Sequence, residues 1–201
     1  MFRRYAFAWC YLGAYVVAEI VYAALGPHGQ AVLTNWTTTS VSNLEHEPLI
    51  PLIGSAFVTP GEHGDYFAWP VLIALALFGA NRALGNVRTP LICLAGHVIG
   101  TLVSEGIVAY RVDTGQLPVS YRNLIDVGPS YVVVSAIVIA LIAGTWPARV
   151  AAAFDLALLV FAGNIFGGLS SLDVAAVGHL TAIASAATIT TLTLRARHRS
   201  R

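Results

Sequence analysis

A serine and a histidine near the starts of two apolar stretches could together perform nucleophilic chemistry. Ser130 follows Gly128 and Pro129, and proline suits the start of a helix because its missing N–H costs nothing there. We expect Ser130 in the first helical turn, where free backbone N–H groups and the helix dipole can stabilise an oxyanion. A serine beside a histidine general base is the smallest activated nucleophile. His179 is the candidate for that base.

Two further polar residues are expected at the same depth as Ser130 and His179, near the same ends of their helices. Glu19 and Asn164 lie near the corresponding ends of their own apolar stretches, and His179 lies about 9 Å along its helix from Asp173. An ionisable group inside a bilayer is costly, so each one needs a partner or a function. We therefore expect Glu19 to face the bundle interior, with Asn164 or His179 as its partner.

Each of these residues also has a purely structural interpretation. Ser130 in a first turn can simply satisfy backbone donors, and His179 can be a buried histidine bonded to a neighbouring helix. His97 and Asp155 lie toward the opposite ends of their stretches, so we expect structural roles for them. The sequence alone leaves both interpretations of the Ser130–His179 pair open.

The composition identifies the elements that must position these residues. Hydrophobic residues make up 57% of the 201 residues and charged residues only 10%, whereas soluble domains carry roughly 25% charged residues. The composition therefore indicates a polytopic membrane protein. A net charge of +1 argues against nucleic acid as a partner. Cys10 and Cys93 lie inside apolar runs, so we expect neither a disulfide framework nor a thiolate metal site.

Six apolar stretches predict an all-α bundle of six transmembrane helices in a single domain, residues 1–201. In lipid every backbone N–H and C=O must be satisfied internally, so each stretch is expected to be a helix. Residues 26–65 would form a loop between the first two helices, and residues 195–201 a basic tail. The stretches are 5–25, 66–80, 89–110, 127–144, 148–166 and 174–194.

The distribution of arginine predicts the orientation in the membrane. One side carries only Arg111 and Arg122, and the 26–65 loop on that side has no arginine. By the positive-inside rule, both termini lie in the cytoplasm and the 26–65 loop lies outside. The arginines of the cytoplasmic side are Arg3, Arg4, Arg82, Arg88, Arg149, Arg195, Arg197, Arg199 and Arg201.

Four short segments resemble the rhomboid superfamily of intramembrane serine proteases and their non-catalytic relatives. Residues 47–57 (EPLIPLIGSAF) resemble the family's loop after its first helix, and residues 79–85 (GANRALG) resemble the turn that closes its second. Residues 128–130 (GPS) and 178–179 (GH) match the serine and histidine motifs of the fourth and sixth helices. Their order and spacing extend the resemblance over nearly the whole chain.

The resemblance implies a six-transmembrane-helix rhomboid-like bundle in a bacterial plasma membrane, similar to divergent rhomboid-like proteins of actinobacteria. It implies Ser130 as nucleophile and His179 as general base, with no metal or organic cofactor. The substrates or clients would be single-span membrane proteins held in the lipid bilayer. Ala182 and Ala186 match the family's small residues after the histidine and permit close helix packing.

Several positions depart from the pattern of active family members. Tyr131 follows the serine where a small residue is usual. Tyr66 and Pro70 occupy the places of a histidine and an asparagine that help to bind the oxyanion, and Leu49-Ile50 replaces a Trp-Arg pair.

These departures leave three functions open. The first is an intramembrane serine protease, and the second is an inactive pseudoprotease that binds client transmembrane helices. The third is a small-solute transporter using Glu19, His97 and Glu105. For a protease, the residues expected to support the site or its oxyanion region are Gly128, Tyr131, Asn164 and Glu19.

Overall fold

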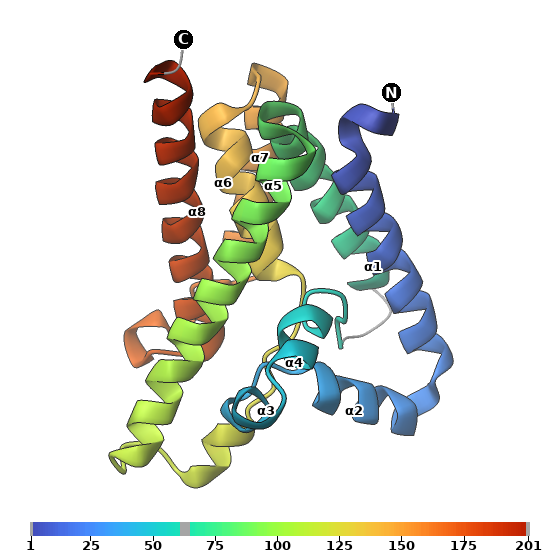
Figure 1. The fold of residues 1–201 in the computed structure, drawn as a ribbon. Coiled ribbons are helices and arrows are strands. Elements are labelled where there is room, and N and C mark those ends of the chain that lie inside the picture. The colour runs from blue at the N-terminus through green and yellow to red at the C-terminus, as the bar shows by residue number, and fades with distance from the viewer. Residues whose placement is uncertain (1, 61–64, 200–201) are drawn as a thin grey trace.

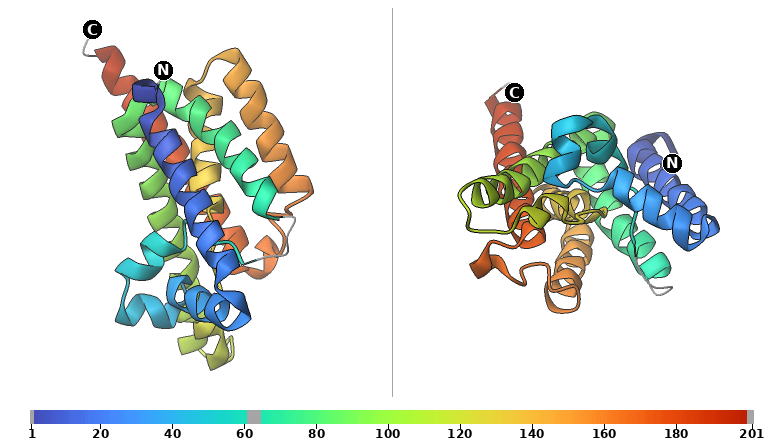
Figure 2. Two further views of the ribbon diagram at one scale, coloured as in Figure 1. Left: turned by 90° about the vertical axis from the view of Figure 1, so that its right-hand side faces the viewer. Right: turned by 90° about the horizontal axis from the view of Figure 1, so that it is seen from below.

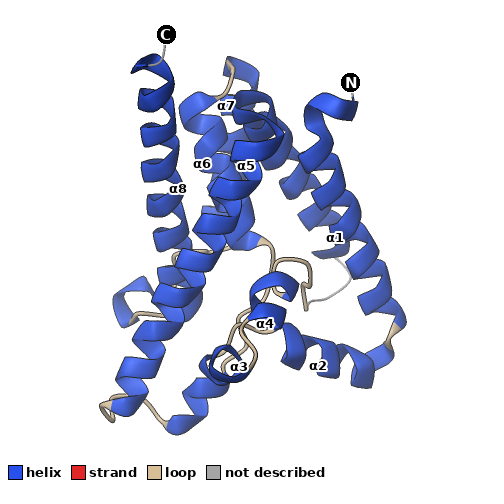
Figure 3. Cartoon of the chain, in the orientation of Figure 1, coloured by secondary structure: helices blue, strands red, loops and turns tan. Residues whose placement is uncertain are grey.

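The computed structural model describes residues 2–60 and 65–199, and every regular element in that part of the chain is helical (Figure 3). The fold class expected from the sequence, all-α, is therefore confirmed. In chain order the elements are η1 (Phe2–Tyr5), α1 (Ala6–Ala24), α2 (Gly26–Thr37), α3 (Val41–His46), α4 (Leu49–Gly54), α5 (Asp65–Asp113), η2 (Val119–Asn123), α6 (Ser130–Ala143), α7 (Trp146–Phe161), η3 (Leu169–Ser171) and α8 (Val174–Arg199).

α5 is a helical hairpin that reverses at Gly85, and it contains the second and third apolar stretches. Gly85 has a φ of 85°, a backbone conformation that glycine adopts without steric cost. Hydrogen bonds across the turn hold the two arms together: Thr89 Oγ1 donates to Ala80 O at 3.2 Å, and Asn81 Nδ2 to Asn86 Oδ1 at 2.9 Å. Residues 65–84 are called the first arm and residues 86–113 the second arm.

Both ends of the described chain lie at one end of the bundle, which we call the termini end (Figures 1 and 2). α2, α3 and η2 lie at the other end, which we call the loop end. This arrangement agrees with the expectation that both termini share one side of the membrane. Which side that is stays a prediction.

Three helices are long and apolar enough to cross a membrane by length and composition: Arg3–Ala24, Phe67–Asp113 and Val174–Arg197. α6 is a shorter apolar helix of 14 residues. Its residues from Tyr131 to Ala140 are all buried, as expected for a helix that is apolar on every face and surrounded by others. The structure is thus a helical membrane bundle around α6, and six spans stay a prediction.

Small residues bring the second arm, α6 and α8 close together. A Cβ on Gly96 would collide with Ser135 of α6, and a Cβ on Gly100 would lie 2.9 Å from Gly178 O of α8. Glycine at these positions lets the helix backbones approach. This close packing fixes the relation between the start of α6 and the start of α8.

The 26–65 segment, expected as a loop, contains three short helices. The Ser40 side chain caps α3 by accepting from Asn43 N, a common way to satisfy a free N–H at a helix start. The chain then turns back toward the middle of the bundle through α4 (Figure 1). Leu49, Ile50 and Ile53 of α4 stay exposed, and the residues that follow, among them Ser55 and Ala56, are buried. This return brings residues 52–59 into contact with α1 and the second arm.

Candidate active site

Ser130 is the first residue of α6, in the first turn as expected. Gly128, two residues earlier, has a φ of 147°, which favours glycine, and its N–H donates to Ser55 O at 2.8 Å. The start of α6 is therefore tied to the end of α4. Ser130 itself is half-buried, and its hydroxyl makes no hydrogen bond within the described part of the chain.

Ser130 lines a cavity of about 10 Å³ beneath the 26–65 segment. A cavity of this size holds about one water molecule. Hydroxyl, imidazole and carboxylate groups from four parts of the chain contribute to its wall. The lining residues are Thr39, Ser55, His97, Asp126, Val127, Gly128, Ser130 and Tyr131.

His97 lies at this cavity, where sequence reasoning had not placed it. Its Nε2 lies 3.0 Å from Leu52 O and 3.2 Å from Ser55 Oγ. Because the Leu52 carbonyl can only accept, Nε2 carries the proton, and the imidazole ties α4 to the second arm. The sequence places His97 toward the opposite end of its stretch and predicts a structural role for it. The return of α4 brings Ser55 down to the histidine.

His179 is buried near the start of α8, with its Nδ1 3.0 Å from Ile165 O. The carbonyl accepts, so Nδ1 carries the proton and Nε2 has a free lone pair. Within the described residues Nε2 has no hydrogen-bond partner. The Ile165 carbonyl is positioned by the turn after α7, in which Asn164 has a φ of 48°.

Tyr131 is the α6 residue that packs against His179. The two ring centroids lie 5.0 Å apart at an interplanar angle of 85°, a favourable edge-to-face arrangement. The phenol ring occupies the space beside Gly178, where an added Cβ would lie 2.8 Å from Tyr131 Cε1 and closer still to the hydroxyl. The glycine before His179 therefore makes room for Tyr131.

Asp126 connects this tyrosine to the 26–65 segment. Tyr131 Oη donates to Asp126 Oδ2 at 2.9 Å, and Thr39 Oγ1 donates to Asp126 O at 2.9 Å. The Asp126 N–H donates to Thr38 Oγ1 at 2.7 Å. Burial raises the pKa of the Asp126 carboxyl above its ordinary value, hydrogen bonds from Tyr131 and Thr39 lower it in part, and the charge of Asp173 raises it.

Glu19 faces the bundle interior, as expected, but its partner differs. Glu19 is buried, and its Oε1 accepts from Thr59 N at 2.9 Å. The expectation of Asn164 or His179 as the partner was wrong, because the chain after α4 returns along α1 and brings its own backbone amide closer. Asn164 lies beyond the end of α7 at Phe161 and is exposed.

Comparison with known protein families gives a match that includes all of these residues. The family model described as "Rhomboid-like protein" matches residues 2–199. The chain belongs to the rhomboid-like protein family. No curated protein and no solved structure matches it in the corresponding comparisons.

In this rhomboid-like protein the expected site residues are only partly gathered. Tyr131 contacts His179, whereas Ser130 faces the His97 cavity and Glu19 lies against Thr59. Pro70 lies within the first arm, and the Tyr66 side chain lies outside the described residues. Over the described residues, no group of three or more His, Cys, Asp or Glu side chains could hold a metal ion.

Proposed function

We propose that this rhomboid-like protein binds transmembrane helices of other membrane proteins without cleaving them. The observation that carries the proposal is the contact between Tyr131 and His179. A general base must lie within hydrogen-bond reach of the nucleophile it activates. Here the partner of the imidazole on α6 is a phenol ring, which is held in place by Asp126.

The cavity at Ser130 supports the same proposal. Its volume of about 10 Å³ matches one water molecule, and a peptide carbonyl with its flanking chain is much larger. His97 and Asp126 line the cavity, while His179 does not. For a substrate to reach Ser130, Thr38 and Thr39 would have to move away from Asp126, and Ser55 away from Gly128, to which they are hydrogen-bonded.

A groove between the first arm and α7 is a suitable place for a client helix. It has a volume of about 450 Å³, and small residues line it, including Gly79, Ala148 and Ala151. Small residues allow the backbone of a second helix to approach closely, which favours helix association in lipid. Large apolar side chains on the same two elements, Val71 and Phe161, are exposed.

Proteolysis is the second candidate function, and the tautomer of His179 favours it. With Nδ1–H bonded to Ile165 O, Nε2 is free to accept a proton, as a general base requires. The reaction would be acyl transfer: Ser130 Oγ attacks the scissile carbonyl while His179 accepts and later returns the proton. That route requires Tyr131 to leave its place against the imidazole.

Photo-cross-linking tests the client groove. A photoreactive amino acid at Ala151 should capture single-span membrane proteins of full length in native membranes. The matched control is the same amino acid at Leu192, which is exposed on α8. Equal capture at both positions would argue against the groove, and capture of cleaved fragments at Ala151 would favour the protease.

A further inference from the structure

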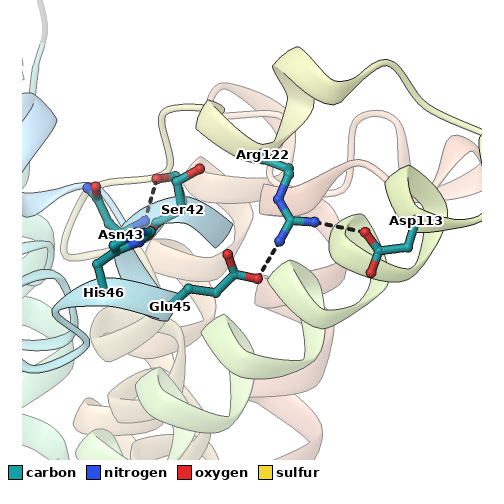
Figure 4. A network of polar contacts seen from close by, with 7 residues as sticks. Ser42, Asn43, Glu45, His46, Asp113 and Arg122 are labelled. Atoms are coloured by element: carbon teal, nitrogen blue, oxygen red, sulfur yellow. Dashed lines mark hydrogen bonds and ion pairs between the residues drawn. The ribbon is translucent and has the colours of Figure 1, made fainter.

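The loop end of the bundle carries two arginines, Arg111 and Arg122, and they differ in their partners. Arg122 on η2 forms ion pairs with Glu45 of α3 and, at 2.8 Å, with Asp113 of α5 (Figure 4). Two carboxylates thus neutralise one guanidinium. These contacts join η2 to α3 and to the end of the second arm.

Arg111 has no such partner. Its Nη1 donates to Ser171 O at 2.8 Å, and no carboxylate of the described residues lies within ion-pair distance of it. The backbone carbonyl leaves most of the guanidinium N–H groups unused. The side chain is half-buried, so it stays accessible from one side.

This unpaired guanidinium lines a cavity of about 200 Å³ between the second arm, η2, η3 and the start of α8. Most of the other walls are apolar, formed by Val108, Leu124, Leu172 and Val174. Asp173 also lines the cavity, but its Oδ1 accepts from Ala175 N at 3.1 Å. That carboxylate therefore serves the start of α8.

We propose that this cavity binds the phosphate group of a membrane phospholipid, with Arg111 as its anchor. Arg111 lies two residues before the end of a helix that is long and apolar enough to span the bilayer, at the level expected for lipid headgroups. A guanidinium fork can bind two phosphate oxygens at once. Tyr121 at the cavity adds an aromatic side chain of the kind enriched at this level.

The apolar walls identify a lipid as the source of the phosphate. Free inorganic phosphate would gain nothing from Leu124, Leu172 or Val174, because it has no apolar part to bury. The glycerol and the first methylene groups of an acyl chain can cover those side chains, and burial of apolar surface is favourable. One headgroup with the start of its chains therefore fits both the charge and the walls.

Native mass spectrometry of the purified full-length protein in detergent, titrated with phosphatidylglycerol, tests the proposal. Arg111→Ala should weaken lipid binding about tenfold, the typical effect of losing a hydrogen-bonded charge pair. Arg111→Lys keeps the charge and should retain most of the binding. Arg149→Ala on α7 is the matched control, because Arg149 also donates to a backbone carbonyl, Ile142 O at 3.1 Å, and does not line the cavity; it should bind the lipid as the unchanged protein does. Thermal unfolding of each variant shows that it is folded.

Two results would overturn the proposal. If Arg111→Ala, folded as judged by its unfolding temperature, binds phosphatidylglycerol as tightly as the unchanged protein, the anchor is wrong. If inorganic phosphate displaces the lipid at equal concentration, the apolar walls contribute nothing and the ligand is not a lipid. Retention of the lipid against phosphate, combined with loss in Arg111→Ala, supports the site.

Discussion

Replacing Gly178 with alanine tests the packing of Tyr131 against α8. The added Cβ would lie 2.8 Å from Tyr131 Cε1 and closer to its hydroxyl, so the phenol ring must move. Moving it disrupts the edge-to-face contact with His179 and the hydrogen bond to Asp126. The three nearest atoms to the added Cβ all belong to Tyr131, which makes the expected effect specific to one side chain.

The magnitude follows from three contributions. The aromatic contact is worth about 1 kcal/mol, and a hydrogen bond to a charged group about 2 kcal/mol. Alanine gains about 1 kcal/mol over glycine in helix propensity. Gly178→Ala should therefore destabilise the protein by about 2 kcal/mol. In a Tyr131→Ala background the same change should be neutral or stabilising by about 1 kcal/mol, because only the propensity remains.

The assay measures the temperature at which the Cys93 thiol becomes accessible as the protein unfolds. Cys93 is buried, whereas Cys10 is exposed, so in a Cys10→Ser protein a thiol-reactive dye reports unfolding alone. Gly100→Ala is the matched control. Its added Cβ would meet the backbone oxygen of Gly178 at 2.9 Å, so removing the Tyr131 side chain should not rescue it. If Tyr131→Ala fails to relieve Gly178→Ala, the described packing is wrong.

Three further predictions concern the loop end. Because burial raises the pKa of Asp126, the folded state binds the carboxyl proton more tightly than the unfolded state does. The unfolding temperature should therefore fall as pH rises from about 4. In Asp126→Asn, unfolding temperatures measured over the same pH series should not show this fall. Arg122→Gln or Glu45→Gln should lower the unfolding temperature slightly, and added salt should shrink the difference, because the ion pair lies at the surface. If the 26–65 segment is outside, a cysteine at exposed Glu47 should react with an impermeant maleimide in intact cells while one at Arg199 stays unlabelled; the reverse pattern would invert the orientation.

The helical class and the helical stretches were predictable because apolar residues dominate the chain and lipid enforces helices. Gly85 belongs to the 79–85 segment that resembles the family's turn after its second helix, but the sequence of that segment does not show that the helix reverses there without a loop. That reversal depends on a φ of 85° and on Thr89 meeting Ala80 across the turn. Long-range contacts of this kind are not encoded in hydrophobic periodicity.

The site was predictable in its parts but not in its contacts. Ser130 lies in a first turn and Glu19 faces inward, since local chain geometry and the cost of burying charge decide both. His97 could not be placed at the Ser130 cavity, because that depends on the return of α4. Tyr131 was recognised as a departure from the family pattern, and only the folded chain brings its ring against His179.

Labelling with a fluorophosphonate probe tests the absence of proteolysis most directly. The probe reacts with activated serines, and the comparison is between the protein in its membrane and the Ser130→Ala variant, with an active serine hydrolase added as a positive control. If Tyr131 occupies the place beside His179 that a nucleophile would need, both proteins should stay equally unlabelled while the control is labelled. Labelling of the unchanged protein that disappears in Ser130→Ala would contradict the account and establish Ser130 as a working nucleophile.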